Sequence, residues 1–145
     1  MIVCRCSIAL TLVFAAGAWC QDAAKEKKIL EGKWVPLQAE LAGQKLPEAQ
    51  LKALSLDIAD GAYTVKVGDV VDKGTLKIDP AAKPKAMDII GTDGPNKGKT
   101  FLAIYELKGD TLRICYDLAG KARPTEFFTS KDRPFFLAIY QRAKS

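Results

Sequence analysis

Histidine is absent from this 145-residue chain, and its absence excludes several classes of site. Ser-His-Asp and Cys-His arrangements need an imidazole base, and His-ligated zinc and haem sites need an imidazole ligand. Cysteine is also scarce outside the first twenty residues. Of the four cysteines, Cys4, Cys6 and Cys20 lie in the first twenty residues, which leaves Cys115 alone in the body of the chain. A chain beginning after Cys20 would hold one thiol and no internal disulfide.

No apolar run reaches the about 20 residues that a transmembrane helix needs. Residues 6–14 (CSIALTLVF) form the run nearest the start, preceded by Arg5 and followed by the small residues 15–18. A basic end, a short apolar run and small residues form the pattern of a secretory signal peptide. We therefore predict a signal peptide over residues 1–20.

The leader predicts an exported protein, periplasmic or extracellular, with no transmembrane segment in the mature chain. Cleavage after Ala18 and cleavage after Cys20 both fit the pattern. Lipid anchoring through Cys20 is the alternative location, although a small residue rather than Trp19 normally precedes a lipid-modified cysteine.

Strong charge of one sign is lacking. The chain has 22 basic and 17 acidic side chains, a formal net charge of +5, and the leader contains only Arg5 among them. The mature chain would therefore carry 21 basic and 17 acidic groups, or +4. Its lysines are scattered singly, whereas a nucleic-acid surface needs a basic stripe with interleaved aromatic residues. We expect a solvated exterior and no nucleic-acid partner.

No linker divides residues 21–145, which we predict to be a single domain. Short helices are expected at 23–31 and 47–53. The rest alternates apolar and polar residues between turn signals, which predicts an antiparallel sheet. These patterns indicate an all-β fold, an eight-stranded antiparallel barrel with one or two short helices. The strand-like segments are 33–41, 54–58, 63–67, 74–79, 87–91, 100–108, 111–117 and 135–142.

A five-residue sequence occurs twice, as FLAIY at 101–105 and again at 136–140. It is too short to indicate a repeat architecture. Both copies are apolar on both strand faces, so alternation does not identify the side that faces inward.

Three features imitate catalytic or binding motifs. Residues 94–100 (GPNKGKT) are similar to a phosphate-binding loop, but one residue is missing between the glycines, and a strand-like segment follows instead of a helix. Cys115 shares a strand face with Arg113, which could lower a thiol pKa, but no histidine can act as its base. Glu106 and Glu126 would serve as an acid–base pair only if the fold joined them. We predict a turn at 94–100, a semi-buried thiol, no catalytic residues, no metal and no cofactor.

Gly32-Lys33-Trp34 begins the first predicted strand, and Arg142 ends the last. The order of further motifs supports a family resemblance: Asp79-Pro80, Lys83-Pro84-Lys85-Ala86, Gly94-Pro95, Gly98-Lys99-Thr100, Ile104-Tyr105-Glu106-Leu107, Gly109-Asp110, Ile114-Cys115 and Arg123-Pro124-Thr125-Glu126-Phe127. Together they resemble a family of uncharacterised, lipocalin-like secreted domains of planctomycete bacteria. The resemblance covers about residues 29–143. It implies a lipocalin-like barrel closed structurally by Trp34 under the guanidinium of Arg142, with no established activity.

An eight-stranded barrel is either filled by its own side chains or holds one small ligand. We therefore weigh two non-enzymatic functions, each for a monomer. The first is a binding protein for a small hydrophobic ligand. The alternative is a packed barrel that acts through its surface as an interaction module or as an inhibitor of a secreted enzyme. The candidate ligand-binding residues of the first are Tyr63, Met87, Tyr105, Arg113, Tyr116, Arg123 and Phe128.

Overall fold

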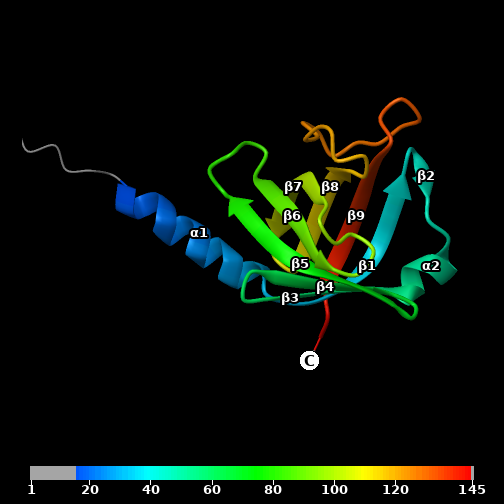
Figure 1. The fold of residues 1–145 in the computed structure, drawn as a ribbon, viewed down its shortest axis with the longest axis horizontal. Coiled ribbons are helices and arrows are strands. Elements are labelled where there is room, and N and C mark those ends of the chain that lie inside the picture. The colour runs from blue at the N-terminus through cyan, green and yellow to red at the C-terminus, as the bar shows by residue number, and fades with distance from the viewer. Residues whose placement is uncertain (1–15, 145) are drawn as a thin grey trace, which may run out of the picture.

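A closed antiparallel barrel forms the body of the protein, whose computed structural model describes residues 16–144 (Figure 1). Eight strands follow one another around the wall, and β1 closes it by pairing with β3 on one side and β9 on the other. This arrangement confirms the predicted all-β, eight-stranded antiparallel barrel with short helices. The elements are α1 (Ala16–Leu30), β1 (Gly32–Leu41), β2 (Gln44–Lys45), α2 (Glu48–Ala53), β3 (Leu54–Ala59), β4 (Ala62–Val67), β5 (Val70–Asp79), β6 (Ala86–Asp93), β7 (Thr100–Lys108), β8 (Thr111–Asp117) and β9 (Phe135–Arg142).

Side chains alternate between the interior and the surface because successive residues of a strand point to opposite faces. In β5, Leu76 and Ile78 are buried, whereas Lys73 and Lys77 are exposed. The scattered lysines therefore lie on the solvated outside, as the sequence predicted.

The alternation changes phase once in β1. The register between β1 and β9 shifts between Pro36 and Gln38. Trp34 and Pro36 are buried before the shift and Ala39 after it. A bulge of this kind adds one residue to a strand, so that inward positions separated by an odd number of residues can face the same core.

Part of the outer wall is also buried, which explains the apolar faces of the repeated FLAIY sequence. The Phe, Ala and Tyr of both copies belong to the interior core. On the outside, Ile104, Cys115 and Leu137 form a second cluster, packed against Phe127 and Phe135. Phe127 belongs to the long connection between β8 and β9, residues 118–134, which lies over this part of the wall (orange in Figure 1).

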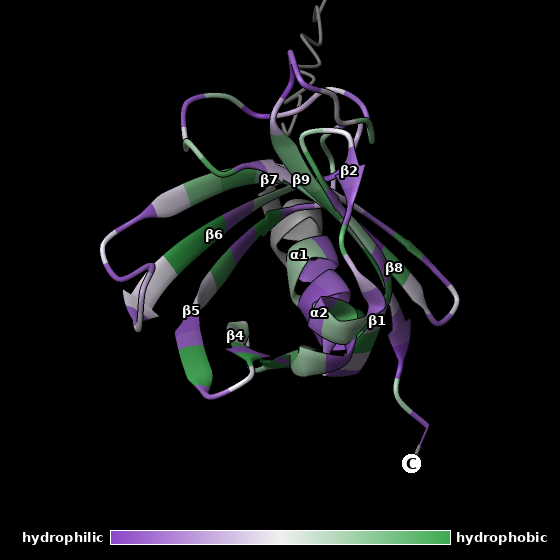
Figure 2. Cartoon of the chain, turned by 90° about the vertical axis from the view of Figure 1, so that its right-hand side faces the viewer, coloured by the Kyte–Doolittle hydropathy of each residue, from purple (hydrophilic) through white to green (hydrophobic). Residues whose placement is uncertain are grey.

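The two helices stand at opposite ends of the barrel, α2 in front and α1 behind in Figure 2. At the α1 end, Leu30 and Trp34 are at most 1% exposed. The Trp34 Nε1–H donates to the Leu30 carbonyl at 3.0 Å. The Arg142 guanidinium lies 4.3 Å from the centre of the Trp34 ring, so the contact that the resemblance implied is present. These side chains close this end.

Glu26 attaches α1 to the barrel wall. Glu26 is 8% exposed, and its carboxylate lies between the helix and the wall. It accepts hydrogen bonds from the Tyr105 hydroxyl at 3.1 Å and the Lys85 ammonium at 2.6 Å. The end covered by α1 is thus sealed by apolar packing and by one buried polar cluster.

Local boundaries differ from the predictions in three places. The helix predicted at 23–31 begins at Ala16, β5 begins at Val70 instead of residue 74, and β2 was not predicted. The predicted signal peptide lies largely in residues 1–15, outside the described residues, and stays a prediction. Within 16–144, no helix is both long and apolar enough to cross a membrane.

Candidate functional site: an apolar cavity inside the barrel

The barrel interior contains a cavity of about 630 Å³ on the α2 side. Small-molecule sites typically have volumes of about 300–1,000 Å³ and mostly apolar walls. All eight wall strands and α2 contribute lining residues, most of them Leu, Ile, Val, Phe and Tyr. Among the described residues that line it, only Gln50, Asp72 and Asn96 carry an amide or a carboxyl group. The interior is therefore not filled by its own side chains.

The cavity reaches the surface at a rim of apolar residues. Leu41, Val67, Val70 and Leu118 line it and are nevertheless 38–52% exposed. Because the α1 end is sealed by buried side chains, this rim marks the side from which a ligand can enter.

A polar cluster interrupts the apolar wall at Asp72. This residue is 8% exposed, and its carboxylate accepts three hydrogen bonds. The Tyr63 hydroxyl donates at 3.1 Å, and the backbone and side-chain nitrogens of Asn96 both donate at 3.0 Å. Burial, followed by the charge of Asp72, raises the pKa of Tyr63 well above 10, so Tyr63 stays a donor at neutral pH.

Three glycines make room for this cluster. A side chain on Gly74 would place its Cβ 2.5 Å from the Tyr63 ring and 2.0 Å from the Ile90 carbonyl oxygen. On Gly91 the same atom would lie 1.9 Å from the Asn96 carbonyl oxygen, and on Gly94 it would lie 2.9 Å from the Asp72 Cα. Each distance is below what real Cβ atoms show, so the Asp72 cluster depends on glycine at all three positions.

The segment that imitated a phosphate-binding loop is the turn between β6 and β7, and the prediction of a turn is confirmed. Backbone bonds within it run from Lys97 to Gly94 and from Lys99 to Asn96. A strand, β7, follows it. Its role in the structure is to present Asn96 to Asp72.

The structure brings together three of the seven predicted ligand-binding residues. Tyr63, Met87 and Tyr116 all line the cavity. Tyr105 also points inward, but it lies at the sealed end, where it donates to Glu26. The inward orientation of Tyr105 was predicted correctly, but its position along the strand lies beyond the cavity.

The other three candidates lie outside the cavity. Phe128 belongs to the β8–β9 connection and is 53% exposed. Arg113 lies on the outer face, where its guanidinium covers the Phe127 ring at 4.1 Å and donates to Glu106 at 3.0 Å. Strand alternation explains the error for Arg113, because its neighbours Leu112 and Ile114 take the inward positions.

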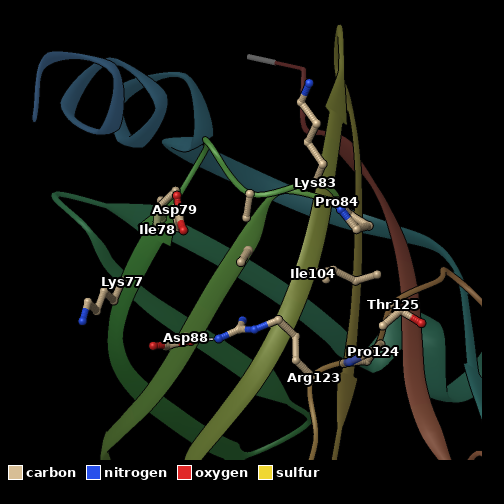
Figure 3. Close-up of a pocket in the computed structure, with 12 residues that line it drawn as sticks. Lys77, Ile78, Asp79, Lys83, Pro84, Asp88, Ile104, Arg123, Pro124 and Thr125 are labelled. Carbon is tan, nitrogen blue, oxygen red and sulfur yellow. Dashed lines mark hydrogen bonds and ion pairs between the residues drawn. The ribbon is translucent and has the colours of Figure 1, made fainter. Parts of the chain in front are cut away.

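Arg123 lines a different hollow, of about 500 Å³, on the outer wall (Figure 3). Its guanidinium is already engaged, donating to the carbonyls of Met87 at 3.1 Å and Ala103 at 2.6 Å and to the Asp88 carboxylate at 2.6 Å. Arg123 therefore attaches the β8–β9 connection to the wall.

The remaining candidate chemistry is separated or buried. Cys115 is fully buried, and burial raises the pKa of its thiol to about 11, against the weaker opposing effects of a backbone hydrogen bond from Phe128 and of the charge of Arg113. Glu106 pairs with Arg113, and Glu126 pairs with Arg133. Within residues 16–144, no three Cys, Asp or Glu side chains gather where they could hold a metal ion.

Sequence reasoning missed Asp72 and Asn96, which form the polar cluster in the cavity wall. A signal for Asp72 was present, because it is in phase with the inward Leu76 and Ile78 once the strand is extended back past Gly74. Asn96 gave no such signal, since the path of a turn places it.

Comparison of the chain with protein-family models, with curated proteins and with solved structures found no match.

Proposed function

We propose that this protein is an exported binding protein that holds a small, largely apolar molecule in its barrel. The observation that carries the proposal is the cavity of about 630 Å³ with its apolar wall and its exposed apolar rim. Export rests on the sequence of residues 1–20. Membership of the lipocalin-like planctomycete family belongs to the same proposal, supported by the closed barrel and the Trp34–Arg142 contact.

The wall is suited to an aliphatic or aromatic ligand. Burying a methylene group contributes about 0.8 kcal/mol, so a ten-carbon chain gains about 8 kcal/mol from leaving water. The loss of translational and rotational freedom on binding removes several kcal/mol of this gain. We therefore expect micromolar affinity for simple apolar molecules. The alternative of a packed interaction module needs a filled interior, and the cavity counts against it.

Binding of N-phenyl-1-naphthylamine, an uncharged probe whose fluorescence rises in apolar surroundings, tests the proposal. The informative variant is Val65→Trp, because Val65 is half-buried in β4 and lines the cavity. The matched control is Lys66→Trp, since the adjacent side chain points to the exposed outer face.

We expect micromolar binding by the wild-type protein, at least about tenfold weaker binding by Val65→Trp, and unchanged binding by Lys66→Trp. Thermal unfolding of each variant checks that the barrel is intact. The proposal is wrong if the wild-type protein leaves the probe fluorescence unchanged, or if both tryptophan variants bind equally well.

A further inference from the structure

Asp72 is the one carboxylate among the described residues that line the cavity, and none of these residues is a lysine or an arginine. Asp72 is 8% exposed, and no Lys or Arg of residues 16–144 forms an ion pair with it. The whole chain, by contrast, has 22 lysines and arginines against 17 acidic residues and a formal net charge of +5. The interior therefore has the opposite sign of charge from the molecule as a whole.

A buried carboxylate without a positive partner is costly, since its loss of hydration must be offset by hydrogen bonds or by an opposite charge. Tyr63 and Asn96 supply three hydrogen bonds. An ionised carboxylate has about four acceptor positions, which leaves one for another donor. The oxygen of Tyr63, which donates its own proton to Asp72, can also accept a hydrogen bond.

This arrangement is built rather than incidental. Gly74, Gly91 and Gly94 leave the space that Tyr63 and Asn96 occupy around the carboxylate. Position 72 is inward and in phase with Leu76 and Ile78, so an apolar residue there would continue the apolar wall without a buried charge. The carboxylate is thus held by Tyr63 from β4 and by Asn96 from the turn between β6 and β7.

We propose that the preferred ligand of the cavity is an apolar amine, whose protonated nitrogen binds the Asp72 carboxylate while its hydrocarbon part fills the apolar remainder. This inference rests on the proposed function and specifies its ligand class. An ammonium group has three N–H donors, two of which can bind the free acceptor position on Asp72 and the Tyr63 oxygen. A fatty acid of the same length would bring a second negative charge to Asp72 and is disfavoured.

The first test compares three ten-carbon probes on the wild-type protein below their micellar concentrations. Decylamine, decanol and decanoate differ only in the head group, and each is titrated against bound N-phenyl-1-naphthylamine. Hydrogen bonds to charged groups are strong enough that decylamine should bind about ten- to a hundredfold more tightly than decanol, with decanoate the weakest.

The second test removes the charge with Asp72→Asn, which keeps an oxygen that can accept from Tyr63 and Asn96. The matched control is Asp69→Asn, which removes the same charge from the exposed turn before β5. We expect Asp72→Asn to abolish the preference for the amine, so that the ratio of the affinities for decylamine and decanol falls to about one. Asp69→Asn should keep the wild-type preference for the amine.

The two proposals fail in different ways. If the wild-type protein binds decanol at least as tightly as decylamine, or prefers decanoate, the amine inference is overturned while the binding function stands. An amine preference that survives in Asp72→Asn also overturns it. Should no probe bind to the wild-type protein, the proposed function fails and the inference fails with it. The wild-type comparison decides the question even if Asp72→Asn does not fold.

Discussion

Arg142→Met tests whether the last residue of β9 stabilises the sealed end of the barrel. The methionine keeps an apolar stem and removes the guanidinium. That group lies 4.3 Å from the centre of the Trp34 ring, and such a contact contributes about 1 kcal/mol when partly desolvated. It also donates to the Glu31 carbonyl and, at 2.8 Å, to the Ile29 carbonyl at the end of α1.

The half-buried bond to Glu31 contributes about 1.5–2 kcal/mol, because hydrogen bonds from charged donors are stronger than neutral ones. The exposed bond to Ile29 and the pair with Asp110, whose side chain is 74% exposed, add about 0.5 kcal/mol together. We therefore expect Arg142→Met to lower the free energy of unfolding by about 3 kcal/mol, measured by urea denaturation.

Arg133→Met is the matched control, because its pair with Glu126 joins side chains that are 54% and 68% exposed. Surface pairs of this kind contribute at most about 1 kcal/mol, and often nothing measurable. The reasoning is refuted if Arg142→Met stays within about 0.5 kcal/mol of the wild-type protein, or if both variants lose the same stability.

Two further predictions concern the interior. Gly74→Ala should lower the free energy of unfolding by at least about 2 kcal/mol and weaken probe binding, because the new Cβ would lie 2.0 Å from the Ile90 carbonyl oxygen. Gly109→Asn, in a turn with open space around it, should change stability by less than about 1 kcal/mol; equal losses in urea denaturation would contradict the argument. At alkaline pH, stability should be complete below about pH 9 and fall above it, because burial raises the pKa of the Cys115 thiol from 9.0 to about 11 and the pKa of all four tyrosines above their ordinary 10.0, while the unfolded chain releases these protons near pH 9 and pH 10. Urea midpoints between pH 8 and pH 11.5, followed with tyrosinate absorbance, check this, and tyrosines that titrate near pH 10 in the folded protein would contradict it.

The cavity shows why site residues are harder to predict from sequence than strands. Alternation correctly placed Tyr63, Met87 and Tyr116 inward, but it carries no information on height along the barrel axis. Tyr105 therefore proved to be inward and yet outside the cavity, at the end sealed by Glu26. Arg123 was predicted to bind the ligand, whereas it lies on the outer wall.

Strand alternation also fails to predict burial where a long connection covers the outer face of the barrel. Ile104 and Leu137 are buried on the outside of the barrel, although they alternate with inward residues. A strand with apolar residues on both faces indicates that something covers its outer face, without identifying the segment. Here residues 118–134 supply the cover, and only the folded chain brings Phe127 over that face.

By itself, the sequence determined the all-β barrel, the positions of most strands, the solvated lysines and the absence of histidine chemistry. These properties follow from local patterns of period two, from turn residues and from composition. The tertiary structure alone decided that the barrel is hollow, that α1 seals one end, and that Asp72 stands in the wall with Tyr63 and Asn96. Volume and charge pairing depend on distances between segments remote in sequence, and those distances exist only after the wall has closed.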